Sequence, residues 1–233
     1  MLIYGRNVAL EVLKKKENIK KVFLQQNFDD KRILSLLEKN KITPIYLEKK
    51  EIDDLIDGKH QGIILDIRDY QYKSLEDVSK DEDAVVVILD HIEDPHNLGA
   101  IIRTCEAAGI KDIIISKNRQ VGVNATVMKT SAGALLNTNV IMVSNIANAI
   151  NVLKKDGFWV VGTTLADDSL DYREVDYSGR IALVIGNEGK GISDIVSKAC
   201  DYRVKIPMRG TINSLNASVA SGIMIYEVIR NRK

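Results

Sequence analysis

Residues 84–116 have the sequence AVVVILDHIEDPHNLGAIIRTCEAAGIKDIIIS, and this stretch decides the fold. Two apolar runs rich in β-branched residues, 84–90 and 112–116, flank a segment whose apolar residues recur with helical spacing from Leu98 to Cys105. β-Branched residues favour strands, whereas a spacing of three and four residues favours a helix. The stretch therefore predicts strand, helix and strand, the repeating unit of an α/β fold.

The same alternation continues to the end of the chain. The runs VIMV (140–143), FWVVGT (158–163) and IALVIG (181–186) are short, apolar and separated by segments with helical patterns. Strands of this kind are typical of a parallel sheet with helices on both faces. Ligands of such sheets bind at the carboxyl ends of the strands. We therefore expect the chemistry in the segments that follow these runs.

The first third of the chain has a different composition, which is rich in lysine. Short apolar runs predict strands, and helical patterns lie between them, so we expect a small α/β unit there. In the last run Ile63, Leu65 and Ile67 alternate with Ile64, Asp66 and Arg68, which predicts one buried face and one mostly wet face. The expected strands cover 21–24, 45–47 and 62–67, and the expected helices cover 30–40 and 49–56.

A charged stretch, YKSLEDVSKDED at 72–83, separates the lysine-rich first third from the more apolar remainder of the chain. It has no sustained apolar period, which is typical of a solvated connector, although a solvated helix within one domain is the alternative. We predict an N-terminal domain over 1–72, a linker over 73–83 and a parallel-sheet domain over 84–233.

Composition limits the class of protein. The chain has 233 residues, 45% hydrophobic and 28% charged, with a net charge of +1, so an RNA-binding surface would have to be a local cluster of cations. Cys105 and Cys200 lack a CxxC spacing, and His60, His91 and His96 lack a ligand-type spacing, so we expect neither disulfides nor a metal. With no signal-like or membrane-length apolar run, we predict a cytoplasmic protein without membrane contact.

Local positive charge is available in the first third. It can bind a phosphate backbone or serve as ordinary solubilising surface, and the sequence leaves both open. The lysines concerned are Lys14, Lys15, Lys16, Lys20, Lys21, Lys49 and Lys50.

The first segment with possible chemistry follows the run that ends at Asp90. Asn97 and Arg103 lie in a polar loop and the helix after it. An arginine one or two turns into such a helix can reach a phosphate or an oxygen nucleophile in the ligand crevice. Taken alone, an exposed helical arginine such as Arg103 is usually a solvated residue, and Asn97 is most simply a helix cap.

The second segment, IALVIGNEGKGIS at 181–193, runs from a buried strand directly into glycines 186, 189 and 191. The backbone there must turn tightly and approach something closely. The spacing fits neither common phosphate-binding glycine motif, so a phosphate cradle is not indicated. A glycine-rich turn before a helix capped near Ser193 explains the glycines but leaves Glu188 without a reason.

The third segment, IPMRGTINSLNASVASGIMIYEVIRNR at 206–232, predicts the end of a strand, a loop with Pro and Gly, and then a helix whose first turn holds Ser214, Leu215 and Asn216. Small residues at its start allow close approach of another backbone. Apolar residues farther along spread over more than one face, which indicates a dimer contact as well as a core contact.

In this order the three segments resemble the three motifs of the SpoU family, also called TrmH, of RNA ribose 2′-O-methyltransferases. The resemblance rests on Asn97 with Arg103, the turn at 186–189, and the helix start at 213–216. YGRNVALEVL at 4–13 and HQGI at 60–63 resemble the substrate-binding domain of the RlmB subgroup, which methylates a guanosine in 23S rRNA.

The resemblance implies a Rossmann-like parallel sheet with a deep trefoil knot, the SPOUT class, and a small N-terminal α/β RNA-binding domain. It also implies S-adenosylmethionine as the cofactor, bound bent in a pocket made by the knot. Residues that would form the pocket are Thr163, Leu165, Ile185, Gly186, Gly189, Ile206, Met208, Ser214 and Leu215.

Catalytic roles are likewise implied by the resemblance. Arg103 would act on the ribose hydroxyl, by electrostatic orientation because arginine stays protonated. Asn97, Glu188 and Asn216 would position the ribose and its surroundings, with Glu188 as the alternative proton acceptor. The implied partners are 23S rRNA or a pre-ribosomal particle and a second copy of the chain, and not DNA.

Three alternatives differ in what they require. A tRNA 2′-O-methyltransferase of the same family would share every motif and differ in the N-terminal domain. A non-catalytic RNA-binding member would have lost Arg103 or the glycine turn, and both are present. A small-molecule enzyme on an ordinary doubly wound sheet would carry a glycine-rich phosphate loop after Leu89, where this chain has Asp90 to Asn97.

Overall fold

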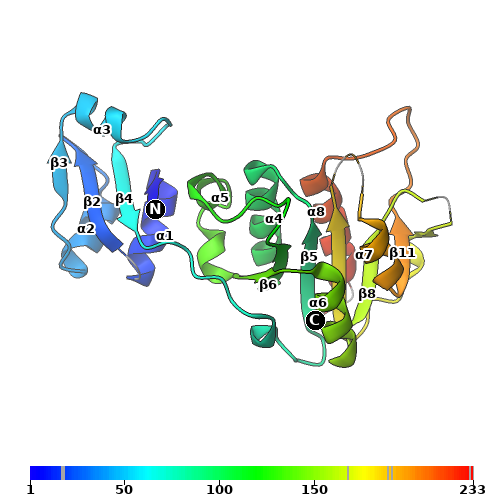
Figure 1. The fold of residues 1–233 in the computed structure, drawn as a ribbon. Helices are drawn as coiled ribbons and strands as arrows, with labels where there is room; N and C mark the ends of the chain where they lie inside the picture. Colours follow the sequence, from blue (N-terminus) through cyan, green and yellow to red (C-terminus); the bar gives the residue numbers. More distant parts are fainter. Residues whose placement is uncertain (17–18, 167, 188, 190, 231, 233) are drawn as a thin grey trace.

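The computed structural model describes residues 1–16, 19–166, 168–187, 189, 191–230 and 232. Two β-sheets organise the chain, one of four strands and one of seven. They lie side by side, joined by a segment that runs beneath the larger sheet (Figure 1). The α/β class predicted from the sequence is confirmed.

The smaller sheet has the order β1-β4-β2-β3, with β4 antiparallel to β1 and β2, and β2 parallel to β3. The predicted strands and helices are all present, but the sequence prediction lacked β1 and α1. Ile64 is fully buried, so the second face of β4 is less exposed to solvent than the alternation of apolar and polar residues predicted. The elements are β1 (Leu2–Tyr4), α1 (Arg6–Lys15), β2 (Ile19–Gln25), α2 (Lys31–Lys39), β3 (Ile45–Leu47), α3 (Lys49–Leu55) and β4 (Ile63–Ile67).

The larger sheet is parallel throughout and has the order β7-β6-β5-β10-β8-β11-β9. Every strand predicted for it is present, whereas the two-residue β9 was not predicted. Its strands are β5 (Val85–Asp90), β6 (Asp112–Ser116), β7 (Asn139–Val143), β8 (Trp159–Thr163), β9 (Leu170–Asp171), β10 (Ile181–Gly186) and β11 (Tyr202–Lys205).

Helices cover both faces of this sheet, and β10 shows how the sequence achieves this. Leu183 and Ile185 pack into one apolar cluster with α4 and α8, whereas Ala182 and Val184 pack into the other with α6 and α7. Successive side chains of a strand point to opposite faces, so an uninterrupted apolar run fills two cores. The helices are α4 (Pro95–Ala107), α5 (Ala125–Thr130), α6 (Ile146–Lys155), α7 (Asp194–Ala199) and α8 (Ala217–Ile229), with short 3-10 turns at 75–77, 134–137 and 172–174.

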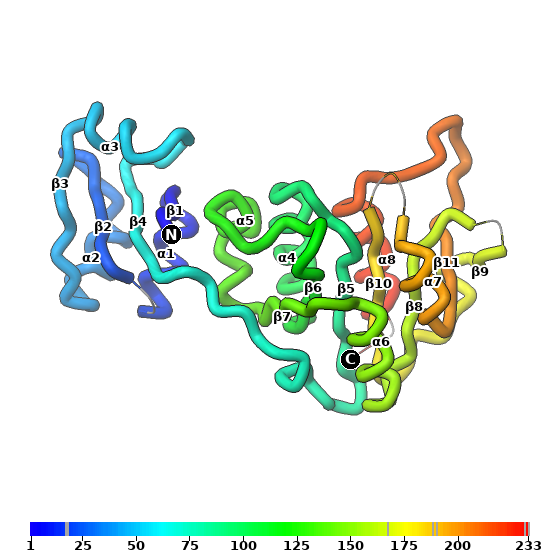
Figure 2. The backbone as a smooth tube through the Cα atoms, in the orientation of Figure 1, coloured from blue at the N-terminus to red at the C-terminus, as the bar shows by residue number. Residues whose placement is uncertain are grey.

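The strand order departs from a simple doubly wound sheet. Strands β7, β6 and β5 follow the usual outward progression. On the other side, β10 lies between β5 and β8, and β11 lies between β8 and β9. The chain therefore returns twice to places between strands already laid down. Figure 2 shows the segment after β11 crossing the carboxyl edge of the sheet on its way to α8.

The connector between the sheets is docked more closely than a solvated linker. Val140 N–H donates to the Tyr70 hydroxyl at 2.9 Å, and Val123 N–H donates to the Tyr72 hydroxyl at 2.8 Å. Farther along, Val78 is buried in the core beside α6. One apolar cluster also runs from the smaller sheet into α5, so the two units share part of their core instead of having separate ones.

Candidate active site

A pocket of about 70 Å³ lies at the carboxyl edge of the larger sheet, where β8, β10 and β11 end. Four loop segments meet there, although they are distant in sequence. Eight of the nine residues predicted to bind cofactor line it: Thr163, Leu165, Ile185, Gly186, Ile206, Met208, Ser214 and Leu215. Gly189 is not among the lining residues.

The turn after β10 is held closed by its own backbone. Asn187 N–H donates to the Gly191 carbonyl at 3.1 Å, and Gly191 N–H donates back to the Asn187 carbonyl at 2.8 Å. A Cβ at Gly186 would lie 2.1 Å from the carbonyl carbon of Gly191, so only glycine fits. Glu188, predicted to be catalytic, lies outside the described residues.

Asn187 also joins this turn to the loop after β5. Its Nδ2 donates to the His91 carbonyl at 3.1 Å, and its Oδ1 accepts from Gly189 N–H at 2.9 Å. The sequence prediction gave Asn187 no role. Its place inside a glycine turn, where a side-chain amide can replace missing backbone partners, was the available signal.

Asp90 is a second residue whose part the sequence prediction missed. It ends β5 and is 1% exposed, and its Oδ2 accepts from Ser193 N–H at 2.7 Å. Its other oxygen lies 2.7 Å from His91 Nδ1 but receives no well-aligned hydrogen bond from the described residues. An acidic residue directly after a buried apolar run was the signal, since a buried carboxylate needs partners. Asp90 thereby fixes the start of α7 against β5.

Asn97 and Asn216 come together across 119 residues of sequence. Asn216 Nδ2 donates to Asn97 Oδ1 at 3.1 Å. The cap expected at Asn97 is wrong, because Asp94 caps α4 and accepts from His96 N–H at 2.8 Å. Asn216 is itself the cap of α8, which starts at Ala217, so Ser214 and Leu215 lie in the preceding loop and not in the helix.

Asn216 both caps α8 and donates to Asn97, and two substitutions at this position separate these roles. Asn216→Ala should lower the free energy of unfolding by about 1 kcal/mol, because the N–H groups of Ser218 and Val219 lose their acceptor. Asn216→Ser should recover most of that stability, since serine also caps helices, but it is too short to reach Asn97. Urea unfolding measures the stability, and turnover by the purified chain measures the activity. We expect activity to fall in both variants; full activity with serine would show that the cap alone matters.

Arg103 stands apart from the pocket. It is exposed on α4, six residues after Asn97 and so roughly 9 Å farther along the helix axis. Within the part of the chain that the structure describes, its side chain has no hydrogen bond or ion pair. The single chain therefore brings Asn97 and Asn216 together at the pocket edge but does not bring Arg103 into the pocket.

Comparison with protein families decides the class. The SpoU rRNA Methylase family matches residues 84–226, more than half of the chain. The chain belongs to this family. An N-terminal match over residues 2–73 is to the substrate-binding region of RNA 2′-O ribose methyltransferases.

Individual SpoU relatives agree over the full length. The chain is 40% identical to a putative TrmH family tRNA/rRNA methyltransferase, YacO, of Bacillus subtilis, covering 99% of this chain and 95% of the relative. The structure of the SpoU methyltransferase AviRb from Streptomyces viridochromogenes, in complex with AdoMet, superposes with a TM-score of 0.86 at 24% identity, covering 100% and 90%. An AdoMet-bound rRNA methyltransferase from Sinorhizobium meliloti gives 0.83 at 26% identity, covering 100% and 87%.

Membership of the SpoU family makes the chain an S-adenosylmethionine-dependent RNA ribose 2′-O-methyltransferase. The name of the Bacillus subtilis relative covers both tRNA and rRNA as targets. The TM-scores also assign the seven-stranded sheet and its smaller companion to the SpoU fold.

Several other classes of site find no support in this SpoU chain. Burial raises the pKa of both Cys105 and Cys200 to about 12, so neither thiol is an activated nucleophile. Among the described residues, no group of three or more His, Cys, Asp or Glu is arranged to hold a metal ion. No helix in the described ranges is long and apolar enough to cross a membrane.

Proposed function

We propose that this chain transfers a methyl group from S-adenosylmethionine to the ribose 2′-hydroxyl of a guanosine in 23S rRNA. The observation that supports the proposal most strongly is the meeting of loops 163–165, 185–187, 206–208 and 214–217 at one pocket, in a chain of the SpoU family. The Asn97–Asn216 pair lies at the start of α8, which closes this pocket.

The pocket suits the cofactor chemically. Leu165, Ile206 and Leu215 offer apolar contacts to an adenine ring, and the neighbouring loop backbone offers hydrogen-bonding groups. S-Adenosylmethionine would supply a sulfonium methyl group for transfer.

Arg103 is the residue we assign to the attacking ribose oxygen. Methyl transfer needs the oxygen in line with the methyl carbon, and its rate depends on positioning and on stabilised negative charge at that oxygen. A guanidinium donates hydrogen bonds and stays charged, so it orients the hydroxyl without removing its proton. Asn97 and Asn216 would hold the ribose, and Glu188 is the candidate that would accept the hydroxyl proton as the methyl group leaves the sulfonium.

A homodimer would complete this arrangement. Val219, Gly222, Ile223 and Tyr226 form a stripe along α8, and Val219 and Tyr226 are about half exposed. Their spacing of three and four residues places them on one side of the helix. We propose that a second copy covers this stripe and that Arg103, distant from the pocket of its own chain, acts in the completed site.

We also infer a trefoil knot in the C-terminal part. After β11 the chain crosses the carboxyl edge and continues into α8, which packs on α4 and β10. This crossing passes the loop that follows β10, where the strand order is interleaved. Knots are rare, so this inference draws mainly on membership of the SpoU family.

We propose that residues 1–72 form the RNA-binding domain, 73–83 the linker and 84–233 the methyltransferase domain. The N-terminal family match and the lysines near α1 and α3 support RNA binding there. A pre-ribosomal particle is the alternative form of the substrate, and we expect the reaction in the cytoplasm.

The decisive experiment is transfer of labelled methyl from S-adenosylmethionine to unmodified 23S rRNA and, in parallel, to bulk tRNA. Alkali-resistant linkages then map the product, because a methylated 2′-oxygen cannot cleave its phosphate linkage. We expect label at one rRNA guanosine. Label in tRNA alone would keep the chemistry and overturn the rRNA target. Absence of label in both RNAs, with S-adenosylmethionine bound, would favour a non-catalytic RNA-binding protein or a need for the particle.

A further inference from the structure

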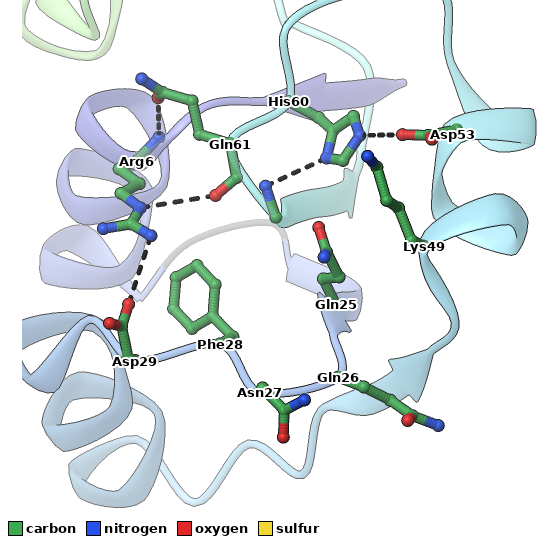
Figure 3. A pocket seen from close by; sticks show the side chains of 11 residues that line it. Arg6, Gln25, Gln26, Asn27, Phe28, Asp29, Lys49, Asp53, His60 and Gln61 are labelled. Atoms are coloured by element: carbon green, nitrogen blue, oxygen red, sulfur yellow. Dashed lines mark hydrogen bonds and ion pairs between the residues drawn. The ribbon is translucent and has the colours of Figure 1, made fainter.

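A second pocket, of about 480 Å³, lies in the N-terminal unit, away from the cofactor pocket. It is bounded by the start of α1, the loop after β2, α3 and the turn before β4 (Figure 3). Figure 1 places these elements on the same side of the molecule as the carboxyl ends of β5 and β10. One RNA molecule lying along this side could touch both pockets.

Arg6 and Phe28 form a stacking platform in this pocket. The guanidinium carbon lies 5.1 Å from the centre of the Phe28 ring. Arg6 Nε donates to the Gln61 carbonyl at 3.4 Å, and Nη2 donates to Asp29 Oδ1 at 3.4 Å, so the guanidinium is oriented while 39% of its side chain stays exposed. Unpaired RNA bases bind by stacking on aromatic rings and on arginine planes.

Carboxamide side chains line the same pocket, and Figure 3 shows that of Gln25 turned into it. Gln25, Gln26 and Asn27 line the pocket, and the structure gives their side chains no hydrogen bond to any described residue. Each carboxamide offers both donors and an acceptor, which is the combination that pairs with the edge of a base. The pocket therefore offers hydrogen bonds to the edge of a base that is stacked on Phe28.

The charges favour a base over a phosphate. Arg6 and Lys49 contribute two positive charges, whereas Asp29 and Asp53 contribute two negative ones. A phosphate would meet repulsion from the carboxylates as well as attraction from the cations. A neutral base meets neither, so the balanced charge suits the base of a nucleotide whose phosphates remain at the rim.

The turn before β4 is built to hold its shape. Gly62 N–H donates to His60 Nδ1 at 3.0 Å, which leaves the ring proton on Nε2 to donate to Asp53 Oδ1 at 2.7 Å. Gln61 has a positive φ of 57°, and its Oε1 accepts from Arg6 N–H at 2.9 Å. A non-glycine residue is held in this conformation only where its surroundings fix it. His60 is therefore a positioning residue for the pocket.

We propose that this pocket binds an unpaired nucleotide of the RNA substrate, with the base stacked on Phe28 and Arg6. The proposal rests on the proposed function, because it takes RNA as the ligand of the N-terminal unit. It adds a defined subsite to general RNA binding by residues 2–73. It also predicts that the substrate presents a loop or a bulge at this position.

The test uses the full-length chain and two RNA probes, a hairpin with a randomised single-stranded loop and the same stem as a blunt duplex. Phe28→Leu keeps apolar bulk but removes the ring, and Arg6→Lys keeps the charge but removes the plane. By filter binding without cofactor, we expect each to weaken hairpin binding roughly tenfold, since stacking of one base is worth about 1–3 kcal/mol. Duplex binding should not change.

Matched controls lie in the same unit outside the pocket. Tyr46→Leu removes an aromatic ring that is 54% exposed on β3. Arg68→Lys changes another exposed arginine, which follows β4 at the end of that strand away from the pocket. Both should bind the hairpin as the unchanged chain does. Thermal unfolding and S-adenosylmethionine binding confirm that every variant is folded.

Two results would overturn the proposal: undiminished hairpin binding by both pocket variants, or an equal loss of hairpin and duplex binding, which would indicate a contact to the RNA backbone. Ultraviolet crosslinking of the hairpin should add a nucleotide to the peptide that holds Phe28. Because binding is measured without methyl transfer, the pocket can fail while the methyltransferase function stands. Equally, the pocket can bind the hairpin even if no methyl group is transferred.

Discussion

Arg103→Ala should reduce methyl transfer by at least about a hundredfold while the affinity for S-adenosylmethionine changes by no more than about twofold. The reason is geometric. Arg103 is exposed on α4 and does not line the cofactor pocket, so its removal leaves the pocket intact. It takes away the group that we assign to the attacking ribose oxygen. Loss of an interaction made in the transition state lowers kcat and kcat/KM together.

The measurement combines single-turnover methyl transfer at saturating RNA with calorimetric titration of S-adenosylmethionine. Lys155→Ala is the matched control, because Lys155 is also an exposed helical cation but lies on α6, against the opposite face of the sheet. It should retain full activity. Loss of cofactor binding in Arg103→Ala would show that Arg103 belongs to the cofactor site instead.

A third variant separates charge from shape at this position. Arg103→Lys keeps one positive charge but loses the planar set of donors. We expect partial activity, between that of the unchanged chain and that of Arg103→Ala. Activity of Arg103→Lys equal to the alanine variant would mean that the guanidinium geometry carries the whole effect.

Local patterns predicted β5, β6, β7, β8 and β10 of the larger sheet because each is a predominantly apolar run. In β10 every residue from Ile181 to Gly186 is buried, so the run itself is the signal. The order of the strands in the sheet could not be predicted in this way. That β10 inserts between β5 and β8 depends on contacts between residues far apart in sequence, and no local spacing encodes it. The two residues of β9 are too few to form a pattern.

Helix α1 was predictable but not predicted. Its buried residues Val8, Ala9, Val12 and Leu13 follow the spacing of one helix face. Helix α1 also contacts the larger unit, because Lys15 Nζ donates to the Leu136 carbonyl.

The connector between the two sheets has a polar composition, yet its residue Val78 is buried. Burial against a distant element is invisible to composition.

In the candidate site, too, some residues were predicted whereas the contacts between distant segments were not. The cofactor-lining residues came from resemblance to the family, and the structure brings eight of them to one pocket. The bonds that hold the pocket walls together, from Asp90 to Ser193 and from Asn187 to His91, were not predicted. Each joins segments about a hundred residues apart, so the signal was the residue type alone.

Gly186→Ala should weaken S-adenosylmethionine binding by roughly tenfold to a hundredfold. A Cβ at this position would lie 2.1 Å from the carbonyl carbon and 2.3 Å from the carbonyl oxygen of Gly191, and both are backbone atoms. Side chains can rotate away from an added methyl group, but the backbone of a closed turn cannot. Overpacking of this kind costs about 1–3 kcal/mol, which opening of the turn would relieve at the expense of the pocket wall.

A graded series of glycine variants tests that argument. At Gly162 an added Cβ would meet the ends of two side chains, Cys200 Sγ at 2.7 Å and Ile192 Cδ1 at 2.8 Å, and no backbone atom as closely. At Gly210 it would meet nothing within 4 Å. Calorimetric titration should therefore rank the loss of affinity as Gly186→Ala, then Gly162→Ala, then Gly210→Ala with no loss. Unchanged affinity in Gly186→Ala would mean that cofactor binding does not need the turn closed, so the Asn187–Gly191 hydrogen bonds would not contribute to it.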